Sequence, residues 1–244
     1  MSLDFRQDFL LNKTVSLKQP IHGYKVAIDP IFLAASVDII KGKILDIGCG
    51  VGAISLCLAH RLKEIEIEGI DIQKDMITLA QYNAIDNKCA DRVHFFEADL
   101  LDYAKKHPES YTTIISNPPF FKKNVSNISP IAQKALAHHD LNLSTSEWIK
   151  NCFKLLKSKG CLYIIFPFDD IPSLLGSLFP AQHSVRLFPL WSKIGQNAKR
   201  VLIRFQKNSL APSRLLNGLV LHEEDGTYTK EANQILRNSM SLEL

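Results

Sequence analysis

The heptapeptide ISNPPFF, residues 115–121, brings together groups that can hold a flat substrate bearing an amine. The side-chain carbonyl of Asn117 and the main-chain carbonyl of Pro118 offer two acceptors for the two N–H bonds of one amino group. An amine held in this way is drawn toward a tetrahedral geometry, with its lone pair free to react. Pro119 restricts the backbone and adds no competing donor, and the Phe120 ring can stack on a base. The same letters also describe a β-strand ended by prolines, so the surroundings must decide between the two interpretations.

A glycine-rich segment, LDIGCGVGAIS, places Gly48, Gly50 and Gly52 between a predicted strand and a predicted helix. Glycines at such a junction let the backbone turn tightly and approach a ligand at the helix N-terminus. Asp46 comes just before them, and its carboxylate would repel a pyrophosphate but attract a cationic amino acid. The spacing therefore favours S-adenosylmethionine (SAM), which carries an ammonium and a sulfonium, over a dinucleotide.

Two further carboxylates end the next two predicted strands. Asp71, in GIDI, follows the glycine loop by about 20 residues, the spacing at which an acidic residue binds a ribose diol. Asp99, in EADL, would accept a hydrogen bond from the exocyclic amine of an adenine. Each acid alone is better explained as a helix cap or a solvated strand end. Acids at three successive strand ends beside a glycine loop indicate a SAM pocket.

Strands and helices alternate along the part of the chain that must position these residues. The predicted strands cover residues 43–50, 65–72, 92–100, 111–120 and 161–168. The predicted helices cover residues 29–40 (Asp29 as N-cap and Pro30 first in the helix), 51–62, 74–87, 144–160 and 170–180, with an irregular excursion over 122–143. From residue 181 the pattern changes to a strand pair, 183–191 and 199–207, then a strand, a turn at Asp225–Gly226 and a final helix.

This order predicts an α/β fold with a mostly parallel seven-stranded sheet, helices on both faces and a terminal antiparallel strand pair. The terminal pair is typical of the Rossmann-like SAM-dependent methyltransferase fold. We expect one methyltransferase domain over residues 1–244, made of an N-terminal arm and helix (1–41), a catalytic core (42–207) and a C-terminal strand-turn-helix extension (208–244). We expect that extension to pack on the sheet rather than to bind RNA.

Composition narrows the class further. The chain is 46% hydrophobic and 22% charged, without a long apolar run or a signal-peptide core, so we expect a cytoplasmic protein and no membrane. The five cysteines show no C-x-x-C pair and no histidine at zinc-ligand spacing, so no metal site is expected. The net charge of +4 permits a polyanionic partner without requiring one.

From residue 23 to 206 the sequence resembles the amino-methyltransferases that carry an N-P-P-[YF] motif. DIGCGVGAIS, GIDI, EADL and NPPF are similar to motifs I to IV of that class, and GYKVAIDPIFLAA resembles the element that closes over the methionine end of SAM. The short arm, KALAHHDLNLSTSEWI, NAKRVLIRFQK and VLHEEDGTYTKEANQILR most resemble the bacterial tRNA1(Val) adenine-N6-methyltransferase family, which modifies adenosine 37. The resemblance implies SAM as cofactor and adds these cofactor-binding residues: Tyr24, Asp29, Cys49, Ile72, Leu100 and Asn117.

Two departures from that family concern the substrate. Phe120 stands where the family often has tyrosine, which keeps the stacking ring and loses a hydroxyl. Ala137-His138-His139 stands where relatives commonly have Ala-Arg-His, so an arginine contact to RNA is missing.

The resemblance implies N6-methylation of adenine in RNA, at adenosine 37 of a valine tRNA. The basic side chains expected to contact tRNA phosphates are Lys122, Lys123, Lys134, Lys193, Lys199 and Arg200, with Lys13 and Lys18 in the arm. The alternatives are N5-methylation of a release-factor glutamine, guanine-N2 methylation of ribosomal RNA, and SAM binding without catalysis. The first usually has a separate N-terminal helical domain, which residues 1–41 are too short to form, and the intact motif argues against the last.

Overall fold

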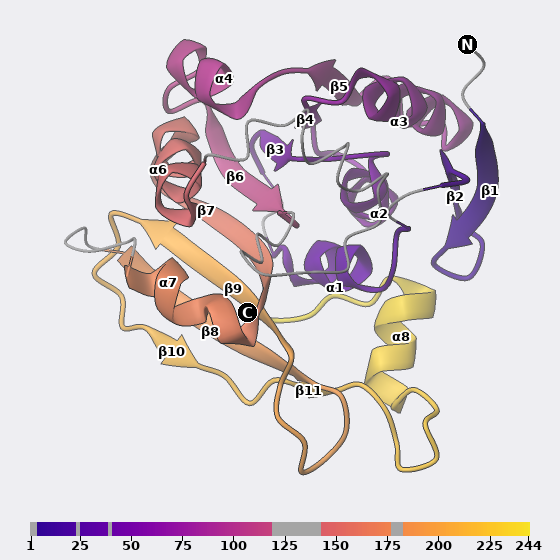
Figure 1. Cartoon of the computed structure of the whole chain (residues 1–244), viewed down its shortest axis with the longest axis vertical. Helices are drawn as coiled ribbons and strands as arrows, with labels where there is room; N and C mark the ends of the chain where they lie inside the picture. Colours follow the sequence, from indigo (N-terminus) through magenta and orange to yellow (C-terminus); the bar gives the residue numbers. More distant parts are fainter. Residues whose placement is uncertain (1–3, 23–24, 39–40, 119–142, 177–182) are drawn as a thin grey trace.

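The computed structural model describes residues 4–22, 25–38, 41–118, 143–176 and 183–244 (Figure 1). Across them runs a nine-stranded sheet in the order β10-β8-β9-β7-β6-β3-β4-β5, with β11 also paired to β8. Its strands are β3 (Ile44–Ile47), β4 (Ile67–Asp71), β5 (Val93–Glu97), β6 (Tyr111–Ser116), β7 (Leu156–Pro167), β8 (His183–Trp191), β9 (Arg200–Lys207), β10 (Arg214–Leu215) and β11 (Leu219–Val220).

The predicted sheet is confirmed. The pairs from β5 through β4, β3 and β6 to β7 are all parallel, whereas β9 is antiparallel to both β7 and β8. The two-residue strand β10 was not predicted, whereas β11 corresponds to the strand predicted in the C-terminal extension before the Asp225–Gly226 turn; both run parallel to β8. In a parallel sheet the carboxyl ends of the strands meet at one edge, which is where ligands bind.

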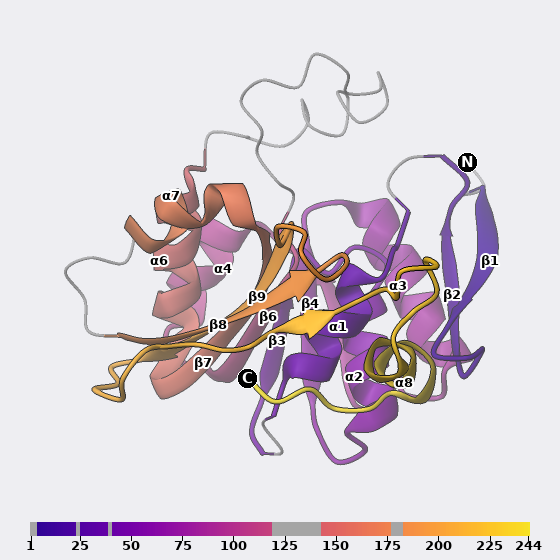
Figure 2. The same ribbon diagram turned by 90° about the horizontal axis from the view of Figure 1, so that it is seen from below.

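Helices cover both faces of the sheet, and each face has its own apolar core (Figure 2). One core contains side chains of α1 (Asp29–Ser36), α2 (Ala53–Arg61) and α3 (Lys74–Asp86). The other contains side chains of α4 (Leu100–Lys106), α6 (Thr145–Leu155) and α7 (Ile171–Gly176), with the 3-10 helix η1 (Phe168–Asp170) before α7. Strand periodicity divides β3 between them, since Ile44 belongs to the first core and Leu45 to the second.

Helix α6 begins as predicted and ends earlier. The Ser144 hydroxyl accepts from the Glu147 N–H and the Glu147 carboxylate accepts from the Ser144 N–H, which is a capping box. The helix ends at Leu155 rather than near Gly160, because Leu156 already pairs with Tyr111 of β6. Sheet pairing therefore overrides the helical pattern of the following lysine-rich residues.

The N-terminal arm is a β-hairpin, which the sequence analysis did not predict. Strands β1 (Phe5–Leu10) and β2 (Val15–Pro20) pair antiparallel. The side chains of Asn83, on α3, and of Asn87, at its C-cap, bond the backbone of β2 at Lys18 and Ser16. The hairpin is thereby fixed to the flank of the fold.

The first helix also differs at its start. Ile28 occupies the N-cap position of α1, so the helix begins one residue earlier than predicted. Asp29 is its first residue rather than its N-cap, and Pro30 is the second rather than the first. The Asp29 carboxylate accepts instead from the Arg200 guanidinium, with Nε and Oδ2 3.2 Å apart.

The C-terminal extension adds β10 and β11 to the sheet, and its final helix contacts both α1 and β11. Helix α8 (Lys230–Asn238) buries Ala232, Ile235 and Leu236 and lies against α1. Beyond it, the Leu242 N–H donates to the Ala35 carbonyl. No helix in the described segments has the length and apolar character needed to span a membrane.

Candidate functional site

Asn117 leaves the sheet beside the glycine loop. Asp46 of β3 lies opposite Ile115 of β6, and the Ser116 hydroxyl donates to the Ile47 carbonyl at 2.7 Å. The chain therefore emerges from these two adjacent strands at the same level, with the glycine loop after one and Asn117 after the other. Asn117 therefore follows the end of β6, beside the strand that carries the glycine loop.

The Asn117 side chain has an unused acceptor. Its Oδ1 atom is buried and has no hydrogen-bond partner among the described residues, and Pro118 beside it is buried. A buried acceptor without a donor costs about 1–3 kcal/mol, so such atoms are few in native folds. An amine donor bound at this point would satisfy it. Pro119 and Phe120 lie outside the described residues.

The glycine loop borders open space. Gly48 and Gly50 have φ values of +69° and +53°, which glycine adopts readily, and a Cβ atom built on either would meet no atom of the described residues within 4 Å. The Gly48 and Cys49 N–H groups donate to the Ile70 carbonyl, which anchors the loop over the end of β4. These two glycines can therefore border a ligand.

Gly52 has a different role. A Cβ atom there would lie 2.6 Å from the Phe95 ring, and one on Gly69 would lie 2.5 Å from it. The Phe95 ring thus packs beneath the loop, against two glycines. Gly52 is needed for this packing and was grouped with the ligand-facing glycines in the sequence analysis.

Asp71 supports the loop from the end of β4. One carboxylate oxygen accepts from the Gly50 N–H and the other from the Gln73 N–H, both at 2.9 Å. Asp71 is 8% exposed, and the following Ile72 is 39% exposed. The Gln73 side-chain amide also donates to Oδ1, at 3.5 Å. A carboxylate offers about four lone-pair positions, so acceptor capacity remains for a hydroxyl donor.

Asp46 lies beneath the loop and is fully buried. Its Oδ2 atom accepts from the Ser55 hydroxyl of α2 at 2.7 Å, and its Oδ1 atom has no partner among the described residues. Burial raises the pKa of Asp46 to about 7, and the charge of Asp71 contributes in the same direction. A cationic ligand group near Oδ1 would offset this cost.

Cys49, inside the loop, has no properties of a nucleophile. Burial raises the pKa of its thiol well above the usual range, and the charges of Asp46 and Asp71 raise it further. The group stays protonated, and its Sγ would lie 3.0 Å from a Cβ built on Gly69. It packs the loop against the sheet.

Asp99 is a helix cap, the alternative that the sequence analysis weighed for a single aspartate. Strand β5 ends at Glu97, short of the predicted residue 100, and α4 begins at Leu100. The Asp99 Oδ1 atom accepts from the Asp102 N–H at 3.0 Å. Asp99 is half-buried, and its Oδ2 atom takes no part in that cap, so the residue keeps one oxygen for a ligand at this edge.

The basic residues proposed for RNA are not one group. Arg200 bonds Asp29, and the Lys199 carbonyl accepts from the Phe168 N–H at the end of β7. The Lys193 ammonium donates to the Glu224 carbonyl. Hydrogen bonds from Thr227 lower the pKa of the neighbouring Asp225, and the Lys193 charge acts in the same direction. Lys193 therefore faces an acidic turn. Tyr24 and three lysines lie outside the described residues: Lys122, Lys123 and Lys134.

The sequence analysis missed four residues that support the site: Ser55, Gln73, Phe95 and Ser116. Each bonds or packs against a residue that was predicted. Gln73 and Ser55 lie at helix starts after predicted ligand segments, which is the only signal that pointed to them. Phe95 and Ser116 are ordinary strand residues by sequence.

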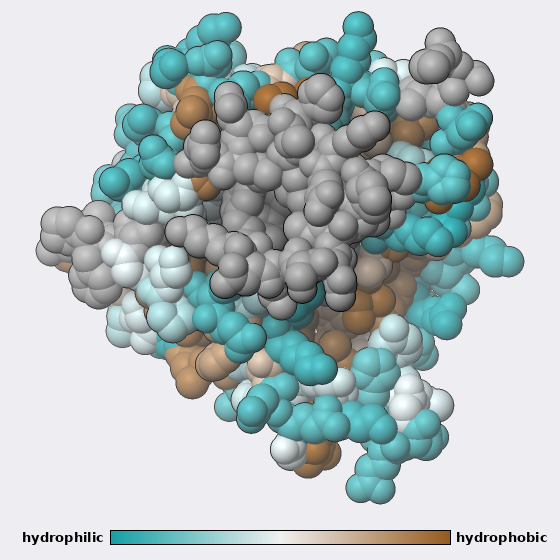
Figure 3. All heavy atoms as spheres, in the orientation of Figure 1, coloured by the Kyte–Doolittle hydropathy of each residue, from teal (hydrophilic) through white to brown (hydrophobic). Residues whose placement is uncertain are grey.

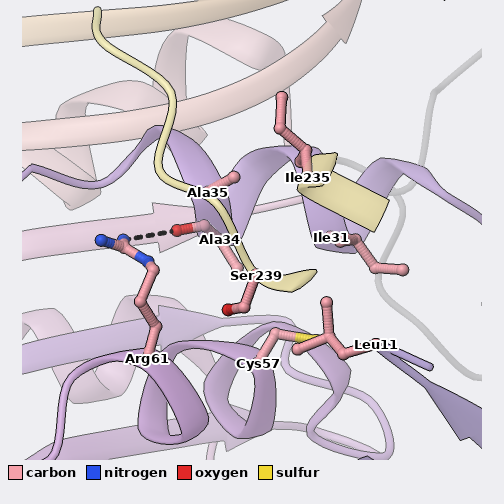
Figure 4. Close-up of a pocket in the computed structure, with 8 residues that line it drawn as sticks. All are labelled: Leu11, Ile31, Ala34, Ala35, Cys57, Arg61, Ile235 and Ser239. Atoms are coloured by element: carbon pink, nitrogen blue, oxygen red, sulfur yellow. Dashed lines mark hydrogen bonds between the residues drawn. The ribbon is translucent and has the colours of Figure 1, made fainter. Parts of the chain in front are cut away.

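Two other features of the described residues do not point to a site. They contain no group of three or more His, Cys, Asp or Glu side chains that could hold a metal. The cavity in Figure 4, between α1, α2 and α8, has a volume of about 10 Å³ and is crossed by Arg61, which donates to the Ala34 carbonyl. That volume is close to the minimum for one water molecule.

Comparison with known proteins gives consistent results. The methyltransferase small domain family matches residues 30–185. The tRNA1(Val) (adenine(37)-N6)-methyltransferase of Dyadobacter fermentans is 30% identical over 234 residues, covering 92% of this chain and 94% of that protein. The protein of the same name from Actinobacillus succinogenes is 31% identical over 215 residues, covering 87% of this chain and 89% of that protein.

Solved structures match at the level of the fold. A predicted O-methyltransferase, Atu636 from Agrobacterium tumefaciens, superposes with a TM-score of 0.73 at 20% identity, covering 88% of this chain and 99% of that chain. TYW2 of P. horikoshii, in complex with MeSAdo, gives a TM-score of 0.58 at 13% identity, covering 84% of this chain and 72% of that chain.

Proposed function

The chain belongs to the methyltransferase small domain family, and on that premise we propose that it transfers the methyl group of SAM to N6 of adenosine 37 in a valine tRNA. The observation that carries the proposal is the buried Oδ1 atom of Asn117, which has no hydrogen-bond partner in the described part of the chain and follows β6 beside the glycine loop. The relatives in Dyadobacter and Actinobacillus bear the name of this reaction and align with most of the chain.

The residues fit SAM as the methyl donor. Gly48 and Gly50 border open space, and the unpaired Asp46 Oδ1 atom suits the ammonium of an amino acid. Asp71 retains acceptor capacity for the ribose hydroxyls, with Ile72 exposed beside it as an apolar wall. When bound, SAM supplies an electrophilic methyl group. Tyr24, Asp29, Cys49, Asp99 and Leu100 complete the proposed set, Cys49 through packing only.

Asn117 and Pro118 act on the acceptor amine. The N6 amine of adenine is a poor nucleophile, because its lone pair is delocalised into the ring. Two carbonyl oxygens that each accept one N–H bond favour the tetrahedral form and direct the lone pair outward. Holding the amine in that orientation lowers the barrier through proximity. We assign Phe120 to stacking on the base and Pro119 to fixing the backbone.

RNA must approach the edge of the sheet where these loops lie. Arg200 begins β9 at that edge and Lys199 precedes it, so these two are the described residues best placed for phosphates. We keep Lys122, Lys123 and Lys134 as proposed contacts. Lys193 is a weaker candidate because the acidic turn at Glu224 and Asp225 would repel a phosphate. Phosphate contacts position the RNA, while the base is recognised in the slot.

The test is to incubate the protein with isotopically labelled SAM and total RNA from a strain that lacks its gene. Nuclease digestion and mass spectrometry then identify the modified nucleoside. We expect labelled N6-methyladenosine that maps to position 37 of a valine tRNA. A tRNA transcript with guanosine at position 37 is the matched control and should stay unlabelled. Label in protein, or in N2-methylguanosine, would overturn the proposed substrate in favour of the glutamine or guanine reaction.

A further inference from the structure

Strand β1 forms one edge of its own small sheet. Within the part of the chain that the structure describes, it pairs with β2 alone. Figures 1 and 2 both place it at the outer margin of the molecule, with β2 between it and the body of the fold. An extended strand with an unpaired edge is a template for a further strand.

Hydrogen-bonded and non-hydrogen-bonded pairs alternate between β1 and β2, and this alternation decides which backbone groups of β1 face outward. The Ile21 N–H donates to the Asp4 carbonyl, so this pair is hydrogen-bonded. The next pair, Phe5 and Pro20, is not hydrogen-bonded, because Pro20 has no N–H to donate. Alternation along an antiparallel pair then directs the backbone groups of Arg6 and Asp8 toward β2. The free edge presents the N–H and C=O groups of Phe5, Gln7 and Phe9.

The sequence of this edge is complementary to itself when read in the opposite direction. A twofold antiparallel pairing centred on Gln7 places Phe5 opposite Phe9 of the second copy. Arg6 and Asp8 already form an ion pair within each strand, with Nε and Oδ2 2.6 Å apart. The pairing sets each arginine opposite the aspartate of the other copy, so the two ion pairs meet with opposite charges facing, and it aligns the outward backbone groups with one another. About six backbone hydrogen bonds would form, two at each pair that includes Phe5, Gln7 or Phe9.

Neighbouring registers are worse. Centring the axis on Arg6 would set two arginines against each other, and centring it on Asp8 would set two aspartates against each other. Like charges directly opposite in a sheet are destabilising, whereas opposite charges and aromatic pairs stabilise. The register centred on Gln7 avoids both repulsions and also pairs the full length of the strand.

The side chains of this strand have the exposure that such a contact needs. Phe5 and Phe9 are 45% and 51% exposed on the same face of the hairpin. The Lys18 ammonium lies over the Phe5 ring, 5.6 Å from its centroid, and bonds Asp86, so its charge is already neutralised. Figure 3 shows apolar surface among hydrophilic side chains at the margin where Figure 1 places β1.

From this edge we propose that the protein associates with a second copy of itself through β1, in the register centred on Gln7, which joins two hairpins into one four-stranded sheet. The contact is short, so it belongs to the weak, concentration-dependent class of interfaces. It is independent of methyl transfer, because none of its residues lies in the proposed active site.

Charge exchange tests the register in solution. The variants Arg6→Glu and Asp8→Lys each place like charges opposite each other in the dimer and should weaken association by about tenfold or more. An equimolar mixture of the two restores opposite charges at both contacts and should dimerise again. Sedimentation velocity from about 1 µM to about 1 mM reads this out. Either variant could also disturb its own hairpin, but only pairing between chains explains recovery on mixing.

Disulfide trapping tests the same register in the otherwise unchanged chain. A Gln7→Cys substitution should crosslink under mild oxidation, because Cα atoms of such a pair lie about 5.5 Å apart. Phe9→Cys alone should not crosslink, whereas mixed with Phe5→Cys it should. The five native cysteines are buried and do not compete. The proposal is overturned if the wild-type chain stays monomeric over the whole concentration range. It is also overturned if Phe9→Cys alone crosslinks as readily as Gln7→Cys.

Discussion

The Asp71 carboxylate accepts a hydrogen bond from the Gly50 N–H at 2.9 Å, which joins the end of one strand to the loop after its neighbour. Asp71, which we assign to the ribose hydroxyls of SAM, therefore also fixes the glycine loop, which we assign to the rest of the cofactor. A substitution at Asp71 acts on both at once, so its effect on binding exceeds that of two lost hydroxyl contacts.

Asp71→Ala should weaken SAM binding by about 100-fold or more, since hydrogen bonds to a charged group contribute about 1.5–3 kcal/mol each. Isothermal titration calorimetry measures the affinity. Asp75→Ala, in the first turn of α3, removes an exposed carboxylate close by in sequence and should leave binding unchanged. Unchanged affinity in Asp71→Ala would sink the ribose assignment.

Asn117→Ala should lower the kcat of methylation by about 10²–10³-fold or more, while SAM still binds. It should also raise the free energy of unfolding by about 1 kcal/mol, because it removes a buried acceptor that lacks a donor.

Asn83→Ala is the contrasting variant for Asn117→Ala. Asn83 is fully buried, and its amide bonds both the Lys18 backbone and the Val51 carbonyl, so its loss should destabilise the fold by about 2 kcal/mol or more. Thermal unfolding with a SAM-binding assay separates the two cases. Loss of SAM binding in Asn117→Ala would contradict its assignment to the acceptor amine.

The pH dependence of stability should carry the signature of Asp46. Its pKa in the folded protein is about 7, above the ordinary value of 3.8, so the folded state binds more protons than the unfolded state between these limits. Stability should therefore fall as pH rises from about 4 to about 7 through this group. Asp46→Asn should flatten that part of the profile and be more stable than wild type at pH 8, as measured by urea unfolding.

Cofactor binding should follow the same group. An ammonium near Asp46 favours the carboxylate, so SAM binding below pH 7 should release a proton. Calorimetry in buffers of different ionisation enthalpy counts that proton. If Asp46→Asn releases as many protons as wild type, the ammonium contact is wrong.

Two glycine substitutions should separate packing from ligand binding. Gly69→Ala drives a methyl group into the Phe95 ring and should cost about 1–3 kcal/mol of stability. Gly48→Ala meets open space and should cost about 1 kcal/mol through its positive φ, while SAM affinity falls much further. Thermal unfolding and calorimetry on both proteins check this. Equal loss of affinity in both variants would argue against a ligand-facing loop.

Much of this arrangement could be predicted from the sequence, because strand periodicity and glycine spacing act over short distances. The glycine loop, Asp71 at a strand end and Asn117 beyond β6 all follow from local pattern plus parallel topology. Asp99 shows the limit of such patterns. The local sequence around an aspartate that precedes a short amphipathic segment is the same whether the residue caps a helix or ends a strand.

What could not be predicted depends on partners distant in sequence. Helix α6 gives way to β7 because Tyr111 is there to pair with Leu156. The arm becomes a hairpin because Asn83 and Asn87 bond its second strand. Phe95 matters only because two glycines from other elements meet its ring. None of these relationships has a local signal.

The ion pair between Asp29 and Arg200 has a consequence for how the chain acquires its structure. The two residues come from opposite ends of the chain, and β9 must insert between β7 and β8 before they meet. On the ribosome, α1 emerges long before its partner is synthesised. High contact order of this kind slows folding, so the start of α1 is among the last parts to be fixed. A nascent chain released before residue 200 would carry the whole glycine loop and Asn117, yet its first helix would lack this anchor.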